Sequence, residues 1–152
     1  MLKYDGYAVV LQEVPDEITL AFNITGCPYH CVGCHSAYLQ SDSGTPLIPH
    51  MLEIIADHFD EISCVAFMGG DHEMPDLMWA AWLVKTNYPN LSLCLYTGND
   101  HPDDSLFDLF DYMKIGHYDQ ELGGLNSPTT NQRMYKHGKD ITYKFYKGRL
   151  YE

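Results

Sequence analysis

The chain has 152 residues, 45% of them hydrophobic, and its 21 acidic and 9 basic side chains give a formal net charge of −12. Phosphate backbones are bound by clustered Lys and Arg, so this charge argues against a nucleic-acid-binding surface. The length fits one domain and leaves little room for a second, so we expect a single domain over residues 1–152.

The N-terminal segment lacks the long apolar core of a secretory signal and meets acidic residues early. No stretch approaches the ~18 consecutive apolar residues of a membrane-spanning helix. We therefore expect a cytoplasmic protein without membrane contacts. The five cysteines are odd in number, and three of them fall between residues 27 and 34. This pattern argues against a disulfide framework and points to metal or redox chemistry.

The N-terminal part of the chain predicts two strands and a long loop. Residues 5–12 and 17–24 are rich in β-branched and aromatic side chains, and Pro15-Asp16 marks the turn between them. Residues 25–46 lack periodicity and contain Gly, Pro, Ser and Asp, which predicts a loop. A loop of this length in a compact domain is usually functional, and this one holds the clustered cysteines.

Helices and strands are expected to alternate in the middle of the chain. The expected elements are a helix over 47–59 with Leu52, Ile55 and Phe59 on one face, a strand over 63–68 ending at Gly69-Gly70, a helix over 75–87, a strand over 91–96 ending at Thr97-Gly98, a short helix over 103–110 and a strand over 112–115. Both strands with continuous apolar runs contain one cysteine, Cys64 or Cys94, which we expect to be a core residue.

This alternation predicts parallel strands joined by right-handed crossovers. Residues 140–151 alternate around Lys147-Gly148 and predict a terminal hairpin. A closed eight-fold barrel takes about 250 residues. The expected fold is therefore α/β, a partial, open (β/α) barrel with parallel core strands and a C-terminal hairpin.

Three cysteines form the motif Cys27-Pro-Tyr-His-Cys31-Val-Gly-Cys34 after a predicted strand. Thiolates are soft ligands that suit iron–sulfur clusters and zinc. Three protein ligands leave one iron of a [4Fe-4S] cluster open, which is typical of a reactive centre. The alternative is a structural zinc site with His30 or His35 as the fourth ligand. Zinc motifs more often show two separated ligand pairs, and the sequence has no second pair, so the spacing favours the cluster.

Five short motifs, two of which overlap the cysteine motif, are distributed over residues 25–133. They are Thr25-Gly26-Cys27, Cys34-His35-Ser36, Met68-Gly69-Gly70-Asp71, Tyr96-Thr97-Gly98 and Asn131-Gln132-Arg133. The cysteine spacing is similar to the signature of the radical S-adenosylmethionine superfamily. The whole set resembles the activating proteins of anaerobic ribonucleotide reductases. The chain departs from that family at His72, where Pro is usual, and at Ile115-Gly116, where Asp-Gly is frequent.

The resemblance implies a radical-SAM-type partial barrel that carries a [4Fe-4S] cluster on Cys27, Cys31 and Cys34. It implies S-adenosyl-L-methionine as cofactor, held by residues of three motifs, namely Gly33, Cys34, His35, Gly69, Gly70, Asp71 and Thr97. Reductive cleavage would give a 5′-deoxyadenosyl radical, with no catalytic residue needed beyond the cluster and cofactor. That radical would generate a glycyl radical on a partner protein.

The implied partners are the large anaerobic ribonucleotide reductase subunit and an electron donor such as flavodoxin or ferredoxin. The same residues leave other functions open. These are activation of another glycyl-radical enzyme, a small radical enzyme acting on a metabolite, and a non-catalytic zinc-binding interaction module. Roles for His72 and Asn131-Gln132-Arg133 stay unassigned.

Overall fold

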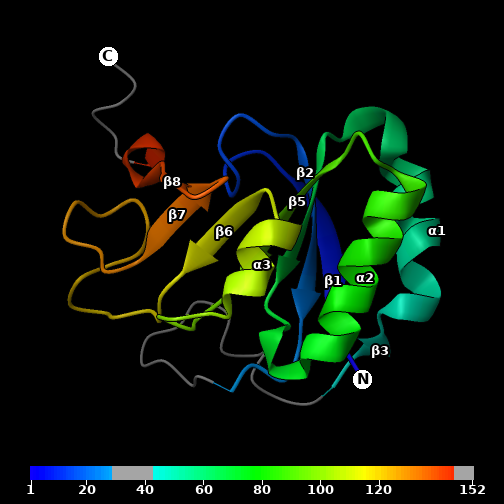
Figure 1. Ribbon diagram of the computed structural model, residues 1–152, viewed down its shortest axis with the longest axis horizontal. Helices are drawn as coiled ribbons and strands as arrows, with labels where there is room; N and C mark the ends of the chain where they lie inside the picture. Colours follow the sequence, from blue (N-terminus) through cyan, green and yellow to red (C-terminus); the bar gives the residue numbers. More distant parts are fainter. Residues whose placement is uncertain (29–42, 146–152) are drawn as a thin grey trace.

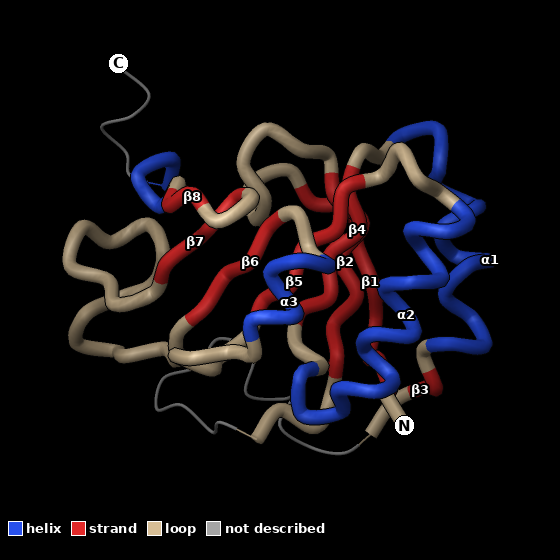
Figure 2. Tube along the Cα trace, in the orientation of Figure 1, coloured by secondary structure: helices blue, strands red, loops and turns tan. Residues whose placement is uncertain are grey.

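The computed structural model describes residues 1–28 and 43–145. One eight-stranded sheet runs through them in the order β3-β1-β2-β4-β5-β6-β7-β8, with its helices packed on one side (Figures 1 and 2). The strands are β1 (Lys3–Val10), β2 (Thr19–Ile24), β3 (Thr45–Pro46), β4 (Cys64–Met68), β5 (Ser92–Tyr96), β6 (Tyr112–Ile115), β7 (Arg133–Lys136) and β8 (Lys139–Asp140). The helices are α1 (Ile48–His58), α2 (Met74–Asn87) and α3 (Asp104–Leu109), with 3-10 turns η2 (Phe59–Glu61), η3 (Asp71–Glu73) and η4 (Thr142–Phe145).

The centre of the sheet is parallel. Strands β2, β4, β5 and β6 pair in parallel, while β1, β3, β7 and β8 join antiparallel at the two edges. Helix α1 lies between β2 and β4 in the sequence, α2 between β4 and β5, and α3 between β5 and β6. The strand-helix alternation in the sequence predicts these connections. The carboxyl ends of the parallel strands therefore meet at one edge, which is where open α/β sheets bind ligands.

Alternate residues of the central strands pack on opposite faces of the sheet. Leu20, Val65, Phe67, Leu93 and Leu95 belong to the core beneath α1, α2 and α3. The opposite face carries a smaller core, which the segment between β1 and β2 and the C-terminal residues cover with three side chains, Val14, Ile141 and Phe145. No helix in the described part of the chain is long and apolar enough to cross a membrane.

The start of β6 is tied to the helix layer. The Asp111 carboxylate accepts hydrogen bonds from the Lys85 ammonium and from the Leu93 N–H, each at 2.8 Å. Burial opposes ionisation of Asp111, but these partners outweigh it and lower the pKa of that carboxyl. The contact thus joins α2, β5 and β6 through one charged side chain.

Two local predictions need correction. The helix expected over 47–59 ends at His58 and tightens into η2, so Phe59 is 42% exposed rather than on the core face. The C-terminal hairpin is formed by β7 and β8, which turn at Gly138, whereas Thr142–Phe145 is a 3-10 turn. The left-handed φ of 81° at Gly138 suits a tight turn, and the predicted turn at Lys147-Gly148 lies outside the described residues.

Candidate functional site at the carboxyl ends of the parallel strands

A pocket lies where β2, β4 and β5 end. Its lining residues come from the three segments that follow these strands, and they are Ile24, Cys27, Pro28, Gly69, Gly70, Asp71, His72 and Gly98. The structure therefore brings the first cysteine of the predicted cluster motif beside the Gly-Gly-Asp motif. These segments are far apart in the sequence, and the parallel pairing of the strands joins them.

Cys27 is partly buried at this pocket. The other predicted ligands, Cys31 and Cys34, lie outside the described residues, as do Gly33 and His35. Within residues 1–28 and 43–145 no group of three or more His, Cys, Asp or Glu side chains could hold a metal ion. The donor chemistry fits a cluster, because a soft thiol faces a pocket lined by two adjacent glycines.

Gly69 and Gly70 shape the wall opposite Cys27. Their φ angles of 112° and 119° lie in the left-handed region, which side chains rarely adopt. A Cβ on Gly70 would lie 3.3 Å from Leu77 Cδ1, and one on Gly69 would lie 3.5 Å from the Ile24 Cβ. Glycine is thus favoured at both positions by the backbone conformation, and at Gly70 also by the close packing of Leu77.

Asp71 and Thr97 form one hydrogen-bonded unit at the ends of β4 and β5. The Thr97 hydroxyl donates to Asp71 Oδ2 at 2.8 Å and accepts the Asn99 N–H at 3.0 Å. Thr97 is only 2% exposed, whereas Asp71 is partly exposed and lines the pocket. Thr97 therefore orients the Asp71 carboxylate, which is a more indirect role than the cofactor contact that the resemblance implies.

His72 lines the pocket but was not assigned by sequence reasoning. Its imidazole packs against the backbone at Gly26, where an added Cβ would lie 3.2 Å from His72 Nε2. The φ of 78° at Gly26 also favours glycine. The sequence signal was available, since His72 directly follows Gly-Gly-Asp at a strand end, but nothing in the sequence shows which way the ring points.

Lys114 is a buried cation at the end of β6 that sequence reasoning missed. It is 9% exposed, and its Nζ donates to the Gly116 carbonyl at 3.0 Å and to the Thr97 carbonyl at 3.4 Å. It also lies 5.7 Å from the centre of the Tyr96 ring. Gln132 Nε2 donates to the same Gly116 carbonyl at 3.3 Å. A lysine within an apolar strand was the available signal, because buried Lys is rare.

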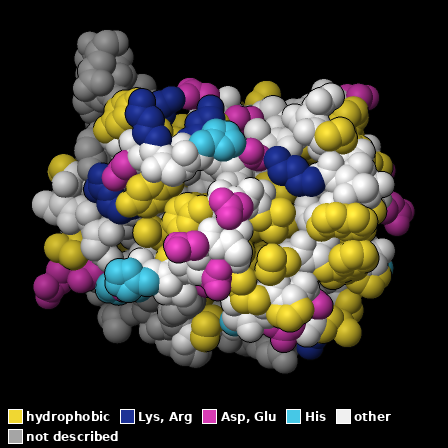
Figure 3. All heavy atoms as spheres, viewed as in Figure 1, with side chains coloured by type: hydrophobic (Ala, Val, Ile, Leu, Met, Phe, Trp, Pro, Cys, Tyr) yellow, Lys and Arg dark blue, Asp and Glu magenta, His cyan; other side chains and the backbone are white. Residues whose placement is uncertain are grey.

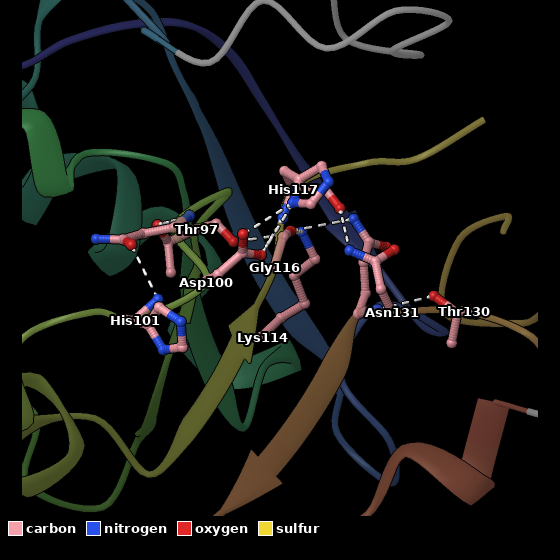
Figure 4. A network of polar contacts seen from close by, with 10 residues as sticks. Thr97, Asp100, His101, Lys114, Gly116, His117, Thr130 and Asn131 are labelled. Atoms are coloured by element: carbon pink, nitrogen blue, oxygen red, sulfur yellow. Dashed lines mark hydrogen bonds and ion pairs between the residues drawn. The ribbon is translucent and has the colours of Figure 1, made fainter. Parts of the chain in front are cut away.

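The loops after β5 and β6 are joined by a polar network (Figure 4). His117 Nδ1 lies 3.0 Å from each carboxylate oxygen of Asp100. The hydrogen bonds from His117 lower the pKa of the Asp100 carboxyl. Asn131 Nδ2 donates to the His117 carbonyl at 3.0 Å. Asn131 and Gln132 of the Asn131-Gln132-Arg133 motif thus support the strand-end loops, while Arg133 forms an ion pair with Asp140 within the terminal hairpin.

The sheet face opposite the helices carries a row of side chains in register with one another. Asn23, Met68, Tyr96 and Lys114 are paired neighbours at the carboxyl ends of β2, β4, β5 and β6. The Tyr96 hydroxyl donates to the Glu13 carbonyl, which fixes its ring. This row lies next to the segments that line the pocket.

The remaining described cysteines are core residues, as predicted. Cys64 and Cys94 are buried on β4 and β5. Burial raises the pKa of the Cys64 thiol to about 12 and raises that of Cys94 as well. Both stay protonated at neutral pH and are poor metal ligands in this form, because metals bind the thiolate.

A parallel α/β sheet with a thiol-bearing loop at its carboxyl edge defines a candidate metal or cluster protein. The chain matches the 4Fe-4S single cluster domain family over residues 18–132, which is most of its length, and it belongs to that family. The family match supports the [4Fe-4S] prediction over the structural zinc site. The comparisons with curated proteins and with solved structures found no match.

Proposed function

We propose that this chain is a radical S-adenosylmethionine enzyme that generates a glycyl radical on the large subunit of an anaerobic ribonucleotide reductase. The observation that carries the proposal is the meeting of Cys27 with Gly69, Gly70 and Asp71 in one pocket. The sequence alone indicates each of these residues as a cluster ligand or a cofactor contact. In this proposal the parallel strands form the core of a partial, open radical-SAM-type barrel.

Cys27, Cys31 and Cys34 would hold the [4Fe-4S] cluster. When bound, the cluster would supply the electron that splits S-adenosylmethionine into methionine and a 5′-deoxyadenosyl radical. Gly33 and His35 complete the implied cofactor contacts. An electron donor of the flavodoxin or ferredoxin class would deliver the electron.

The chain's own residues would bind and orient the cofactor. The backbone at Gly69 and Gly70 lines the pocket, and its carbonyl groups would accept hydrogen bonds from an ammonium. The Asp71 carboxylate, held by the Thr97 hydroxyl, adds a fixed negative charge beside that ammonium. Nothing in this arrangement requires a general acid or base.

The substrate would be a glycine in a backbone segment of the partner, from which one hydrogen atom is transferred to give 5′-deoxyadenosine. Asn23, Met68 and Tyr96, the partly exposed members of the row, adjoin the segments that line the pocket and would meet such a segment, whereas Lys114 is buried.

The test uses protein purified without oxygen. We expect about four iron and four sulfide per chain, and release of 5′-deoxyadenosine when dithionite and S-adenosylmethionine are added. With the reductase subunit also present, we expect a glycyl radical signal in electron paramagnetic resonance. Cys31→Ala should abolish all three results, whereas Cys64→Ala, a matched control in the core, should retain them.

Each alternative function has its own outcome. About one zinc without iron or sulfide would contradict the proposal and favour the zinc-binding module. Release of 5′-deoxyadenosine without a radical on the reductase, but with one on another glycyl-radical enzyme, would correct the partner only. We also expect association with the partner to weaken as salt rises, because the chain carries a net charge of −12.

A further inference from the structure

The outer face of α2 is apolar although the core does not require it. Leu77, Ala80, Ala81 and Val84 form the inner face and are buried under the sheet. Three large side chains point away from this core, Met78 at 38% exposure and Trp79 and Trp82 at 50% each. We call Met78, Trp79 and Trp82 the α2 strip. A helix that is apolar on all sides is normally covered on all sides.

Two observations show that the α2 strip is unusual on this molecule. Neighbouring α1 packs on the same sheet face, and its exposed positions include His50, Glu53 and Asp57, as expected of a surface helix. The two indole rings stack with centroids 5.0 Å apart and planes 12° apart. The pair therefore presents a flat, ordered aromatic surface to solvent rather than two scattered side chains.

Acidic residues flank the α2 strip on both sides. On one side α1 and η2 expose Glu53, Asp57, Asp60 and Glu61, and on the other side α3 and its N-cap expose Asp103, Asp104 and Asp108. Lys85 is the only Lys or Arg in α1, α2 and α3, and it is bound to Asp111. The space-filling view shows hydrophobic side chains gathered over α2 with acidic groups at their border (Figure 3).

We propose that the α2 strip docks an amphipathic protein segment whose apolar side chains are flanked by Lys or Arg. The charge decides against a second copy of this chain, because each chain has a net charge of −12 and the flanks would oppose like charges. A cationic flank would instead meet the acids of α1 and α3. Arg or Lys could also stack on the indole faces.

The position of the α2 strip indicates whose segment it is. Helix α2 begins at Met74, directly after η3, whose first residue is Asp71. At a rise of about 1.5 Å per residue, Trp79 and Trp82 lie about 7 and 12 Å along α2 from its start. A partner held there would extend over the pocket edge. Resting on the proposed function, the segment is assigned to the protein that receives the radical.

The first experiment needs no radical chemistry. Trp79 and Trp82 are the chain's two tryptophans, so intrinsic fluorescence reports directly on the α2 strip. The full chain is titrated with a helical peptide of Leu and Lys, about 18 residues or five turns long, and with a Leu and Glu peptide of the same apolar face. We expect a saturable blue shift with the Lys peptide, weakened by salt, and none with the Glu peptide. No shift with either, or equal shifts with both, would overturn the proposal.

Variants separate the α2 strip from general charge attraction. With a labelled Lys peptide and anisotropy detection, Trp79→Ser with Trp82→Ser should weaken binding at least about tenfold, the effect of losing central aromatic contacts. Glu53→Gln with Asp57→Asn should weaken it about threefold, because each surface charge contributes modestly. Leu122→Ser with Glu121→Gln, an exposed apolar and acidic pair elsewhere, should leave it unchanged. Equal losses in all three variants would contradict a specific surface.

A second experiment links the α2 strip to the partner. The Trp79→Ser, Trp82→Ser variant should release 5′-deoxyadenosine at the wild-type rate without partner, but form the glycyl radical on the reductase subunit at least about tenfold more slowly. Equal radical formation would refute docking of that partner at α2. Loss of 5′-deoxyadenosine from the wild type as well would instead refute the proposed function and leave the peptide result standing. Concentration-dependent dimerisation through the α2 strip would contradict the proposal, because it would show that a second copy of this chain binds there.

Discussion

Replacing Thr97 by Val should weaken the candidate cofactor site without changing its shape. Valine has nearly the volume of threonine but lacks the hydroxyl that donates to Asp71 Oδ2 and accepts the Asn99 N–H. A hydrogen bond to a charged group contributes about 1.5–3 kcal/mol, and a buried N–H left unpaired costs about 1–3 kcal/mol. Asp71 is partly exposed, so water can replace part of the loss at the carboxylate.

We therefore expect Thr97→Val to lower the free energy of unfolding by about 1–3 kcal/mol, mainly through the Asn99 N–H. Loss of the hydrogen bond that orients the Asp71 carboxylate should lower S-adenosylmethionine affinity about tenfold, which corresponds to about 1.4 kcal/mol. Denaturant unfolding measures the first effect, and equilibrium binding to anaerobically reconstituted protein measures the second.

Thr97→Ser is the matched control, because it keeps the hydroxyl and removes only a methyl group. It should bind S-adenosylmethionine within about twofold of the wild type, since the hydrogen bond to Asp71 is retained. If Thr97→Val and Thr97→Ser bind the cofactor equally well, the orienting role of Thr97 is wrong. If both lose affinity while Asp71→Asn does not, the carboxylate is not part of the cofactor site.

Three further predictions concern stability and reactivity. Asp111→Asn should lose about 1–3 kcal/mol at neutral pH by urea unfolding; since the folded pKa of Asp111 is lowered, the loss should be complete above about pH 4 and shrink as pH falls below it. Gly116→Ala should cost more stability than Gly138→Ala, because both glycines have left-handed φ but only at Gly116 would a Cβ lie 3.2 Å from backbone; equal costs would show that packing there is unimportant. Cys64 and Cys94 should resist iodoacetamide at pH 8 until the protein unfolds, since burial raises both thiol pKa values; mass spectrometry would reveal early labelling, which would contradict their burial.

Periodicity predicted the central elements well because burial governs them. Val65, Phe67 and Leu93 are fully buried, so their segments had to be continuous apolar runs, and each strand matches its expected range within one residue. The ends of elements were less predictable. Phe59 fits a helical period, but the chain tightens into η2 at that residue and turns the ring outward, where it contacts Tyr88 at a centroid distance of 5.1 Å.

The candidate site was predictable where chemistry dictates residue type and was not predictable where tertiary packing does. A thiol and two adjacent glycines indicate a ligand site before any coordinates are known, and Cys27, Gly69 and Gly70 do line one pocket. Lys114, in contrast, could not be predicted as part of this region from the sequence. Its charge is accommodated by the carbonyls of Thr97 and Gly116, which only the pairing of β5 with β6 brings within reach.

The same packing connects the candidate site to the α2 strip. Gly70 is the N-cap of η3, which leads into α2, and the missing side chain at Gly70 lets Leu77 of α2 approach the strand end. Leu77 is fully buried, so a shift of α2 along the sheet would disturb its packing against Gly70. A partner bound at Trp79 and Trp82 would therefore rest on the helix that also fixes the pocket wall. Substrate capture and cofactor binding would then both depend on α2.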